Sequence, residues 1–538
     1  MSLSTFFGLN IGVSALDTMQ QAEDVVANNI SNANTPGYVQ ETPQLQEASA
    51  YPPIPSQNQP VMGGQLGQGV AVGVVTRETS AFVNQQDRSN QSTYNMYQTY
   101  HTNLSQIESI LNEPSSNSMQ NAVDQFFASW QTLSTDPTNT AARQSVISEA
   151  QTLGQTFQTI TTQLESLQSN LASQIQGQVQ ELNNYASQVA QLNNQIVQVN
   201  QMNPSQANGG QSSQQESPNQ LLDQRGYILD QMAKLASVSY SAIPGVTGAI
   251  QLQIGNTLMI SSASWTSAGT IATGNLLPPS TGLVLATGSS YSSIGATLSS
   301  ISSGAIAGNA KSLDYTDQLL GKFNSFLLGF ANQVNSVQGS GYPLSGSSTT
   351  SSLNGTVAGV TYSYGNLFIV PPNTNVSAPV TGDVTLQINP LFTQGGGSNY
   401  IAAASTGTTS GSNGDNGNAL NMVTWQSNVP NVSPVTYSAY QVSTTSYQDT
   451  TFKGSSTFDQ YISGIVSNLG ITTSAVNSNE QTANALAQQS TNLRQSISGV
   501  DTNNQAAKMV EYQNSYDAAA KFISIYDQML QSLISMVP

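Results

Sequence analysis

The sequence predicts a mainly α-helical protein with inserted β-rich domains, an α+β multidomain chain built as an elongated helical bundle or coiled-coil rod. Three observations support this fold class. Apolar residues recur at alternating intervals of three and four over long stretches, which is the spacing of a coiled-coil seam. Helical stripes lie at both ends of the chain, so two terminal helices can lie antiparallel beside each other. Short runs of alternating apolar residues interrupt the helices, as strands do.

An N-terminal helix is predicted from apolar residues at helical spacings, namely Leu9, Val13, Leu16, Met19, Val26 and Ile30. Several Asn residues, which are poor in helix interiors, close this stripe. In Thr35-Pro36-Gly37-Tyr38, Pro and Gly occupy the central positions that a type II turn prefers. An amphipathic helix followed by a loop is the simplest interpretation.

The next part of the chain predicts a linker and then long helices. Pro, Gly and Gln are frequent in 41–75, where Val70, Val72 and Val74 alternate as in a strand. We expect helices at 81–111 and 119–133, and a longer heptad-patterned helix from Asp136-Pro137 to Val199. A polar loop should fill 203–217, and a helix should follow through Leu235.

Two β-like segments divide the remaining helices. Ile250, Leu252 and Ile254 alternate in the first, and the second spans 343–413. Helices are expected at 310–337, 418–425 and 458–497, and the last of these has a heptad seam that includes Leu486, Leu493 and Ile497. The expected domains are a terminal coiled coil (1–40 and 499–538), a helical rod (41–238, 309–340 and 415–498) and lateral β-rich insertions (239–308 and 341–414).

The C-terminal helix carries the most regular pattern. Ser498-Gly499 should end the preceding helix, and Asp501 can cap the last one. Its seam consists of Met509, Tyr512, Tyr516, Ala519, Ile523, Tyr526, Leu530, Leu533 and Val537. Val510, Phe522 and Ile525 lie off the seam, so one neighbouring helix cannot cover every apolar face. We therefore expect both terminal helices to be disordered in the monomer and to form an assembly interface between subunits.

Composition excludes several classes of function. The chain has 11 basic and 28 acidic residues, a net charge of -17, which disfavours nucleic acid and anionic membranes. Cys is absent, so disulfides, thiolate metal sites and thiol nucleophiles are excluded. No Lys or Arg precedes Arg77, as the basic region of a signal peptide would require, and no apolar run is long enough for a membrane span. Secretion without a cleavable signal peptide fits this pattern.

Candidate chemical sites are weak. The single histidine, His101, lies on an apolar helix face and is expected to be an interface or core residue. Gly414-Asp415-Asn416-Gly417 lacks the ligand spacing of a calcium loop and reads better as a turn that leads into a helix. We expect no catalytic, cofactor-binding or metal site and no enzyme, and the alternative is an activity within the β-rich insertions.

Several segments resemble one family. The segment 27–38 resembles the N-terminal signature shared by bacterial flagellar rod, hook and hook-associated proteins. The segments 218–225, 414–416 and 496–501, with Tyr512-Gln513, resemble the hook-associated branch of that family. The resemblance includes both ends of the chain and several points between them, and the two β-rich segments show little match.

The resemblance implies a structural subunit of the bacterial flagellum that joins hook to filament and is exported by a type III channel. Its implied partners are copies of itself, the hook protein, the second hook-filament junction protein and a cytoplasmic export chaperone that holds the C-terminal helix. It would lie outside the cell, without membrane insertion or nucleic acid. The alternatives are a rod or hook subunit, which shares the signature, and a secreted adhesin-like or translocator protein.

Overall fold

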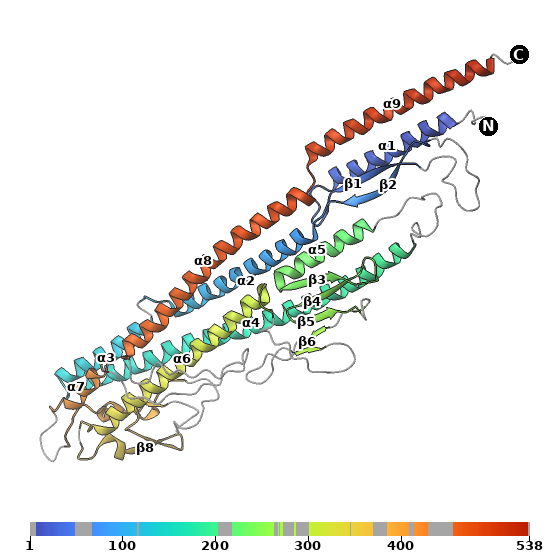
Figure 1. Ribbon diagram of the computed structural model, residues 1–538. Coiled ribbons are helices and arrows are strands. Elements are labelled where there is room, and N and C mark those ends of the chain that lie inside the picture. Colours follow the sequence, from blue (N-terminus) through green and yellow to red (C-terminus); the bar gives the residue numbers. More distant parts are fainter. Residues whose placement is uncertain are drawn as a thin grey trace.

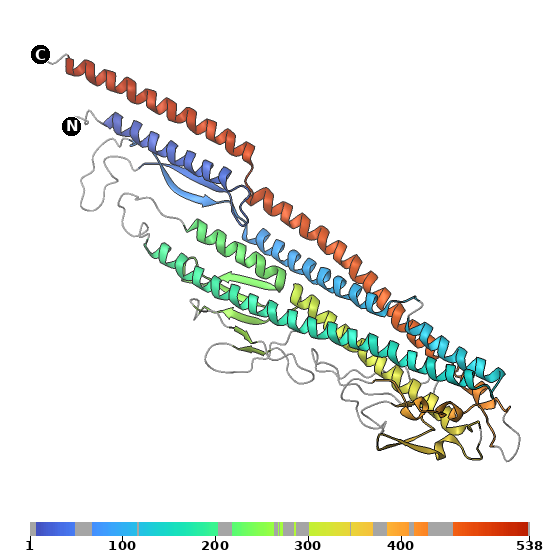
Figure 2. The ribbon, with the colours of Figure 1, turned by 180° about the vertical axis from the view of Figure 1, so that it is seen from behind.

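The computed structural model describes residues 7–48, 67–115, 118–202, 218–262, 267, 270–272, 284–286, 301–344, 346–369, 385–407, 414–428 and 456–535. The molecule is long and narrow, and its helices run along a common axis (Figure 1). Both chain ends lie at one tip, and the β-rich segments lie along the opposite flank and at the far end (Figures 1 and 2). The predicted fold class, a mainly α rod with β-rich insertions, is confirmed.

The helices in the described part of the chain are α1 (Phe7–Ser31), α2 (Ala81–Leu111), α3 (Met119–Thr135), α4 (Thr140–Met202), α5 (Asn219–Leu235), α6 (Ala305–Ser340), α7 (Gly417–Thr424), α8 (Phe458–Ser498) and α9 (Thr502–Ser535). The strands are β1 (Glu41–Glu47), β2 (Val70–Arg77), β3 (Val238–Ala242), β4 (Ile250–Ile254), β5 (Thr257–Ile260), β6 (Thr270–Ala272), β7 (Val284–Ala286), β8 (Asn354–Val357), β9 (Val360–Ser363), β10 (Phe368–Ile369) and β11 (Gln387–Ile388). The predicted linker at 41–75 lies partly outside the described residues, and the predicted loop at 203–217 lies wholly outside them.

Polar side chains define where the rod helices begin. Ser80 accepts a hydrogen bond from the Val83 amide at the start of α2, and Ser118 does the same for α3. Thr457 and Gln460 form a reciprocal capping box at the start of α8. At about 1.5 Å per residue, the 63 residues of α4 make it the longest element of the rod.

One apolar core runs through the rod. Helices α2 and α8 lie side by side, and α4 packs against α3, α5 and α6. At the end far from the chain termini the core becomes aromatic, with ring centroids 5.1 Å apart for Phe330 and Phe458 and 5.5 Å apart for Phe126 and Phe330. Edge-to-face pairs of this kind add to the free energy gained by burial.

The described β-rich residues pack laterally on this core. Strands β3, β4 and β5 form an antiparallel sheet in which Val238 pairs with Ile254, and Leu252 of that sheet is fully buried. Phe392, from the second β-rich segment, is also buried in the rod core. The helix expected at 310–337 begins at Ala305 instead of Ala310, because the apolar pattern of the preceding residues already faces the core.

Four elements form a separate end of the molecule, which we call the terminal unit: α1, the β1–β2 hairpin and α9. Strands β1 and β2 are antiparallel, with Glu41 opposite Arg77. Among the described residues, the core of the rod includes no side chain from these four elements. None of the described helices has both the length and the apolar character needed to cross a membrane.

Candidate assembly interface

Helices α1 and α9 pack against each other in opposite directions. Gly8, near the start of α1, lies against Tyr526, near the end of α9, and Gly12 lies against Ile523. At the other end of the pair, Asn29 donates to the Oε1 atom of Gln505 over 3.1 Å. The antiparallel arrangement predicted for the two terminal helices is therefore confirmed.

Two glycines bring these helices close together. Residues four apart in a helix lie on one face, so Gly8 and Gly12 present a strip without side chains. A Cβ atom on Gly12 would lie 2.5 Å from the Ile523 Cγ1 atom, and one on Gly8 would lie 2.5 Å from the Tyr526 ring. Our sequence reasoning missed this contact, although two glycines four apart in a helical pattern are a readable sign of close packing.

Strand β2 holds the other side of α1. The Ser14 hydroxyl donates to the Val70 carbonyl over 2.5 Å, and the buried Thr18 hydroxyl donates to the same oxygen over 2.8 Å. Helix α1 is thus fixed between the hairpin and α9.

The signature segment supplies a buried polar link. Asn29 is fully buried, and its Oδ1 atom accepts from the Glu41 amide over 2.9 Å and from the Tyr38 hydroxyl over 2.8 Å. Its Nδ2 atom donates to the Glu41 carbonyl over 2.8 Å and to Gln505. One asparagine therefore satisfies backbone groups of β1 and connects α1 to α9.

The corner between α8 and α9 has the predicted form. Helix α8 ends at Ser498, and the Oδ1 atom of Asp501 accepts from the Asn503 amide over 2.9 Å, which caps α9. The Gln40 amide donates to the Ser498 carbonyl over 2.9 Å. The chain just after residues 35–38, which we call the signature turn, therefore contacts the corner between α8 and α9.

The predicted interface residues differ in burial, and Ile523 and Tyr526 lie directly at the α1–α9 contact. On α1 Val26 is buried, Val13 is 43% exposed, and the half-buried members are Leu9, Leu16, Met19 and Ile30. On α9 Tyr516 is 37% exposed, and the half-buried members are Met509, Tyr512, Ile523, Tyr526 and Leu530. The side chain of Leu533 and all of Val537 lie outside the described residues.

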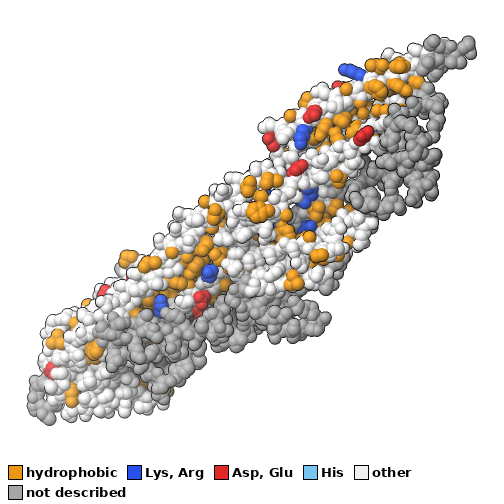
Figure 3. Space-filling view, viewed as in Figure 1, with side chains coloured by type: hydrophobic (Ala, Val, Ile, Leu, Met, Phe, Trp, Pro, Cys, Tyr) orange, Lys and Arg blue, Asp and Glu red, His pale blue; other side chains and the backbone are white. Residues whose placement is uncertain are grey.

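A second apolar face of α9 stays open to solvent. Val510, Phe522, Ile525 and Met529 are 45–59% exposed. Figure 3 shows hydrophobic side chains gathered at the end of the molecule where α1 and α9 lie. Exposed apolar residues grouped on one helix mark interaction sites, and the chain's own α1 covers them only in part.

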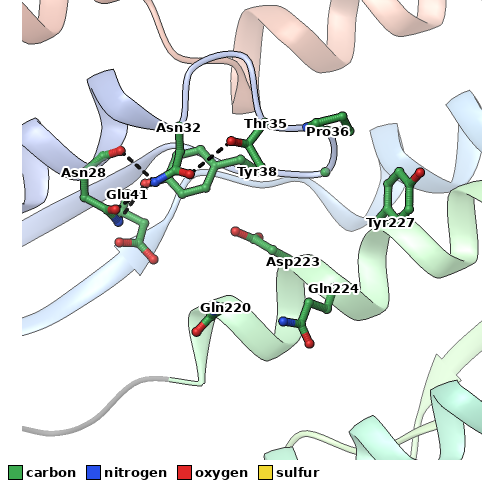
Figure 4. A pocket seen from close by; sticks show the side chains of 11 residues that line it. Asn28, Asn32, Thr35, Pro36, Tyr38, Glu41, Gln220, Asp223, Gln224 and Tyr227 are labelled. Atoms are coloured by element: carbon green, nitrogen blue, oxygen red, sulfur yellow. Dashed lines mark hydrogen bonds between the residues drawn. The ribbon is translucent and has the colours of Figure 1, made fainter.

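A polar cleft separates the signature turn from α5. It encloses about 400 Å³, and its lining includes Tyr38, Glu41, Asp223 and Tyr227 (Figure 4). Burial raises the pKa of Glu41, and burial also raises the pKa of Asp223 although Arg77 acts in the opposite direction. In the described part of the chain, no group of three His, Asp or Glu residues is arranged to hold a metal ion.

The other candidate residues have structural partners. The Nδ1 atom of His101 lies 2.7 Å from the Glu480 Oε2 atom, across the α2–α8 contact. Asp415 accepts backbone hydrogen bonds from Ser405, Thr406 and Gly417, each over 2.8 Å. Burial acts to raise the pKa of Asp415, but these hydrogen bonds outweigh it and lower the pKa to about 2. Asp415 therefore holds the turn before α7.

Comparisons with known proteins agree with this geometry. Residues 104–353 match the family model for the flagellar hook-associated protein FlgK helical domain. Residues 9–38 match the model for flagella basal body rod protein, and 494–536 match the one for the flagellar basal body rod FlgEFG protein C-terminal. The models for the shared ends therefore cover most of the α1–α9 pair, and the hook-associated model covers the rod from the end of α2 through α6.

Individual relatives extend the match to the whole chain. Flagellar hook-associated protein 1 of Bacillus subtilis is 26% identical over 99% of this chain and 98% of its own length. The protein of the same name from Salmonella typhimurium is 30% identical over 48% of this chain and 43% of its length. The solved structure of the flagellar hook junction protein FlgK from Burkholderia pseudomallei has the same fold, with a TM-score of 0.55, 16% identity and coverage of 77% of this chain and 100% of that one.

Proposed function

This chain belongs to the flagellar hook-associated proteins and is a structural subunit of the hook-filament junction, and we propose that it enters that junction through its paired terminal helices. The observation that carries this proposal is the apolar face of α9 that α1 leaves exposed. Copies of this chain and its axial neighbours would cover that face, and the interface would also include the six predicted residues at 9–30 and the eight predicted residues at 509–537.

The free energy of assembly follows from this face. Burying a large apolar side chain contributes about 2 kcal/mol, so Phe522, Ile525 and Met529 together supply a substantial favourable term when a neighbour covers them. Because α9 packs mainly against α1, we expect α9 to be poorly protected from exchange in the isolated chain. Assembly would therefore stabilise the α1–α9 pair, which is only marginally stable in the single chain.

The remaining parts of the proposal concern the route and the neighbours. The chain is exported through the flagellar type III channel, and a cytoplasmic chaperone covers the apolar face of the C-terminal helix before export. Outside the cell, its axial neighbours are the hook protein and the second hook-filament junction protein. The role is structural and needs no catalytic site. The terminal coiled coil (1–40 and 499–538) is the part that assembles. The helical rod is the spacer, and the β-rich insertions form the outer parts.

The first experiment deletes the gene and examines the flagella by electron microscopy. Hooks should persist without filaments, and flagellin should appear in the medium. Filaments of normal length on the deleted strain would refute the junction role. In strains that keep hooks but lack filaments, the fluorescently labelled protein should lie at the hook tip, whereas a rod subunit would lie at the base.

The second experiment tests the interface itself. Complementation with Leu530→Asp should give no filaments, because the charge enters a half-buried apolar contact. The matched control is Gln528→Asp, which places the same charge at an exposed polar position of the same helix and should restore filaments. Normal filaments from the Leu530→Asp strain would exclude the predicted seam of α9 from the interface.

A further inference from the structure

The terminal unit meets the rod at a polar joint. The chain passes between the two parts at residues 78–80 and 499–501, and in the described residues no side chain of the terminal unit belongs to the rod core. A joint of this kind can change its angle without exposing the rod core, because no described side chain of the terminal unit belongs to that core.

Helix α5 of the rod provides the polar contacts at this joint. The Nε atom of Arg77, on β2, donates to the Oδ1 atom of Asp223 over 2.8 Å, and a second guanidinium nitrogen donates to the same oxygen. The Val39 amide lies 3.4 Å from the Asp223 Oδ2 atom. Asn219, at the start of α5, donates to the Val75 carbonyl over 3.1 Å. One carboxylate therefore links β2 and the segment just before β1 to the rod.

The signature turn presses against the same helix. Gly37 has a φ of +85°, and a Cβ atom there would lie 2.8 Å from the Tyr227 Cβ atom. Only glycine fits both this backbone conformation and this separation. Figure 4 shows Tyr227 on α5 beside the Pro36 side of the turn, and Asp223 between α5 and the turn.

We propose that Asp223 and Tyr227 of α5 form a latch that sets the angle between the terminal unit and the rod, with Asp223 as its positioning residue. The exposed fraction of the side chain is 14% for Arg77 and 11% for Asp223. Desolvation offsets much of the attraction in such a pair, so the latch holds one angle and can be released when a neighbouring subunit favours another. The inference goes beyond assembly through α1 and α9 and does not depend on it.

The experiment measures the joint directly in the isolated full-length chain. Because the chain has no Cys, Gln44→Cys on β1 and Ser187→Cys on α4 give two unique sites for nitroxide labels, and both residues are exposed. Double electron-electron resonance should give one narrow distance distribution for the labelled parent. A broad distribution for the parent would overturn the proposal, since no latch would then hold the joint.

Variants then separate the latch from general stability. Asp223→Asn, Arg77→Gln and Gly37→Ala should each broaden or shift the distribution and leave the thermal transition of the rod in place. Asp223→Glu, which keeps the carboxylate, should stay closer to the parent. Glu480→Gln alters the polar contact with His101 inside the rod and should change nothing at the joint. The proposal would be overturned if the three latch variants gave distance distributions with the same width and the same centre as the parent's.

Discussion

Gly12→Ala tests whether α1 and α9 are as close as the structure places them. The added methyl group would lie 2.5 Å from the Ile523 Cγ1 atom and 3.2 Å from the Phe522 ring. A separation below 3 Å forces one helix to move, because Cγ1 is not the free end of the side chain. The nearest relief is a shift of α9 away from α1.

The expected magnitude combines two opposing effects. Overpacking of this kind costs about 1–3 kcal/mol, and replacing glycine by alanine within a helix gains up to about 1 kcal/mol. The net loss at Gly12 is then about 1 kcal/mol, which corresponds to an about fivefold larger population of the open pair and about fivefold faster amide exchange. At Gly8 the obstacle is the end of the Tyr526 ring, which can rotate aside, so Gly8→Ala should cost less.

Pulsed amide hydrogen exchange with mass spectrometry gives the readout, because peptides from α1 and α9 report opening of the pair. The matched control is Gly177→Ala in α4, where an added Cβ atom would meet nothing within 4 Å. Without overpacking, the control should stabilise the rod by up to about 1 kcal/mol and slow its exchange. If Gly12→Ala also slowed exchange in α1, the close contact would be disproved.

Three other substitutions give further predictions. Asn29→Ala should weaken the terminal unit by about 1–3 kcal/mol, since it leaves the Glu41 backbone groups and Gln505 unpartnered, and exchange in α9 that matched the parent would argue against this link. The pKa of Asp415, near 2, lies below the ordinary value of about 3.9, so its stabilisation is fully present above about pH 4 and is lost as the pH falls towards 2. Asp415→Asn should make acid unfolding less steep in that window, as followed by circular dichroism, and an unchanged acid transition would contradict the assignment. Arg494→Gln should lower the stability of the rod by about 2 kcal/mol in calorimetry, because Asp87 and Asp230 both lose a cationic partner, whereas an unchanged melting temperature would mean that other groups compensate.

Periodicity predicted the long elements well because their spacing is local information. The predicted helix at 81–111 coincides with α2, and the start of the helix predicted at 458–497 matches α8. The far end of α8 shows the limit of this reasoning. Leu486, Leu493 and Ile497 continue its heptad pattern but are 37–48% exposed. A straight helix drifts against a strict heptad repeat by about 20° per heptad, so Ala483 of the predicted seam stays buried, whereas Ala487, which lies off the seam, is buried near Leu486 and Leu493.

The polar contacts of the terminal unit could not be predicted from spacing. Arg77 and Asp223 are separated by 146 positions, and neither residue belongs to a periodic pattern. Resemblance to known proteins marked the segments at 27–38 and 218–225 separately, but it did not show that they touch. Only the fold brings Gly37 against Tyr227, because the hairpin and α5 meet at the joint.

The hydrogen bond from Asn29 to Gln505 joins residues that are 476 positions apart in the chain. During synthesis, or during any passage that starts from the N-terminus, α1 therefore emerges long before the segment it needs. A chain that ends before α9 therefore has no partner helix for α1. Only a finished chain can form the antiparallel pair, so an assembly that used both helices, as proposed above, would select finished chains.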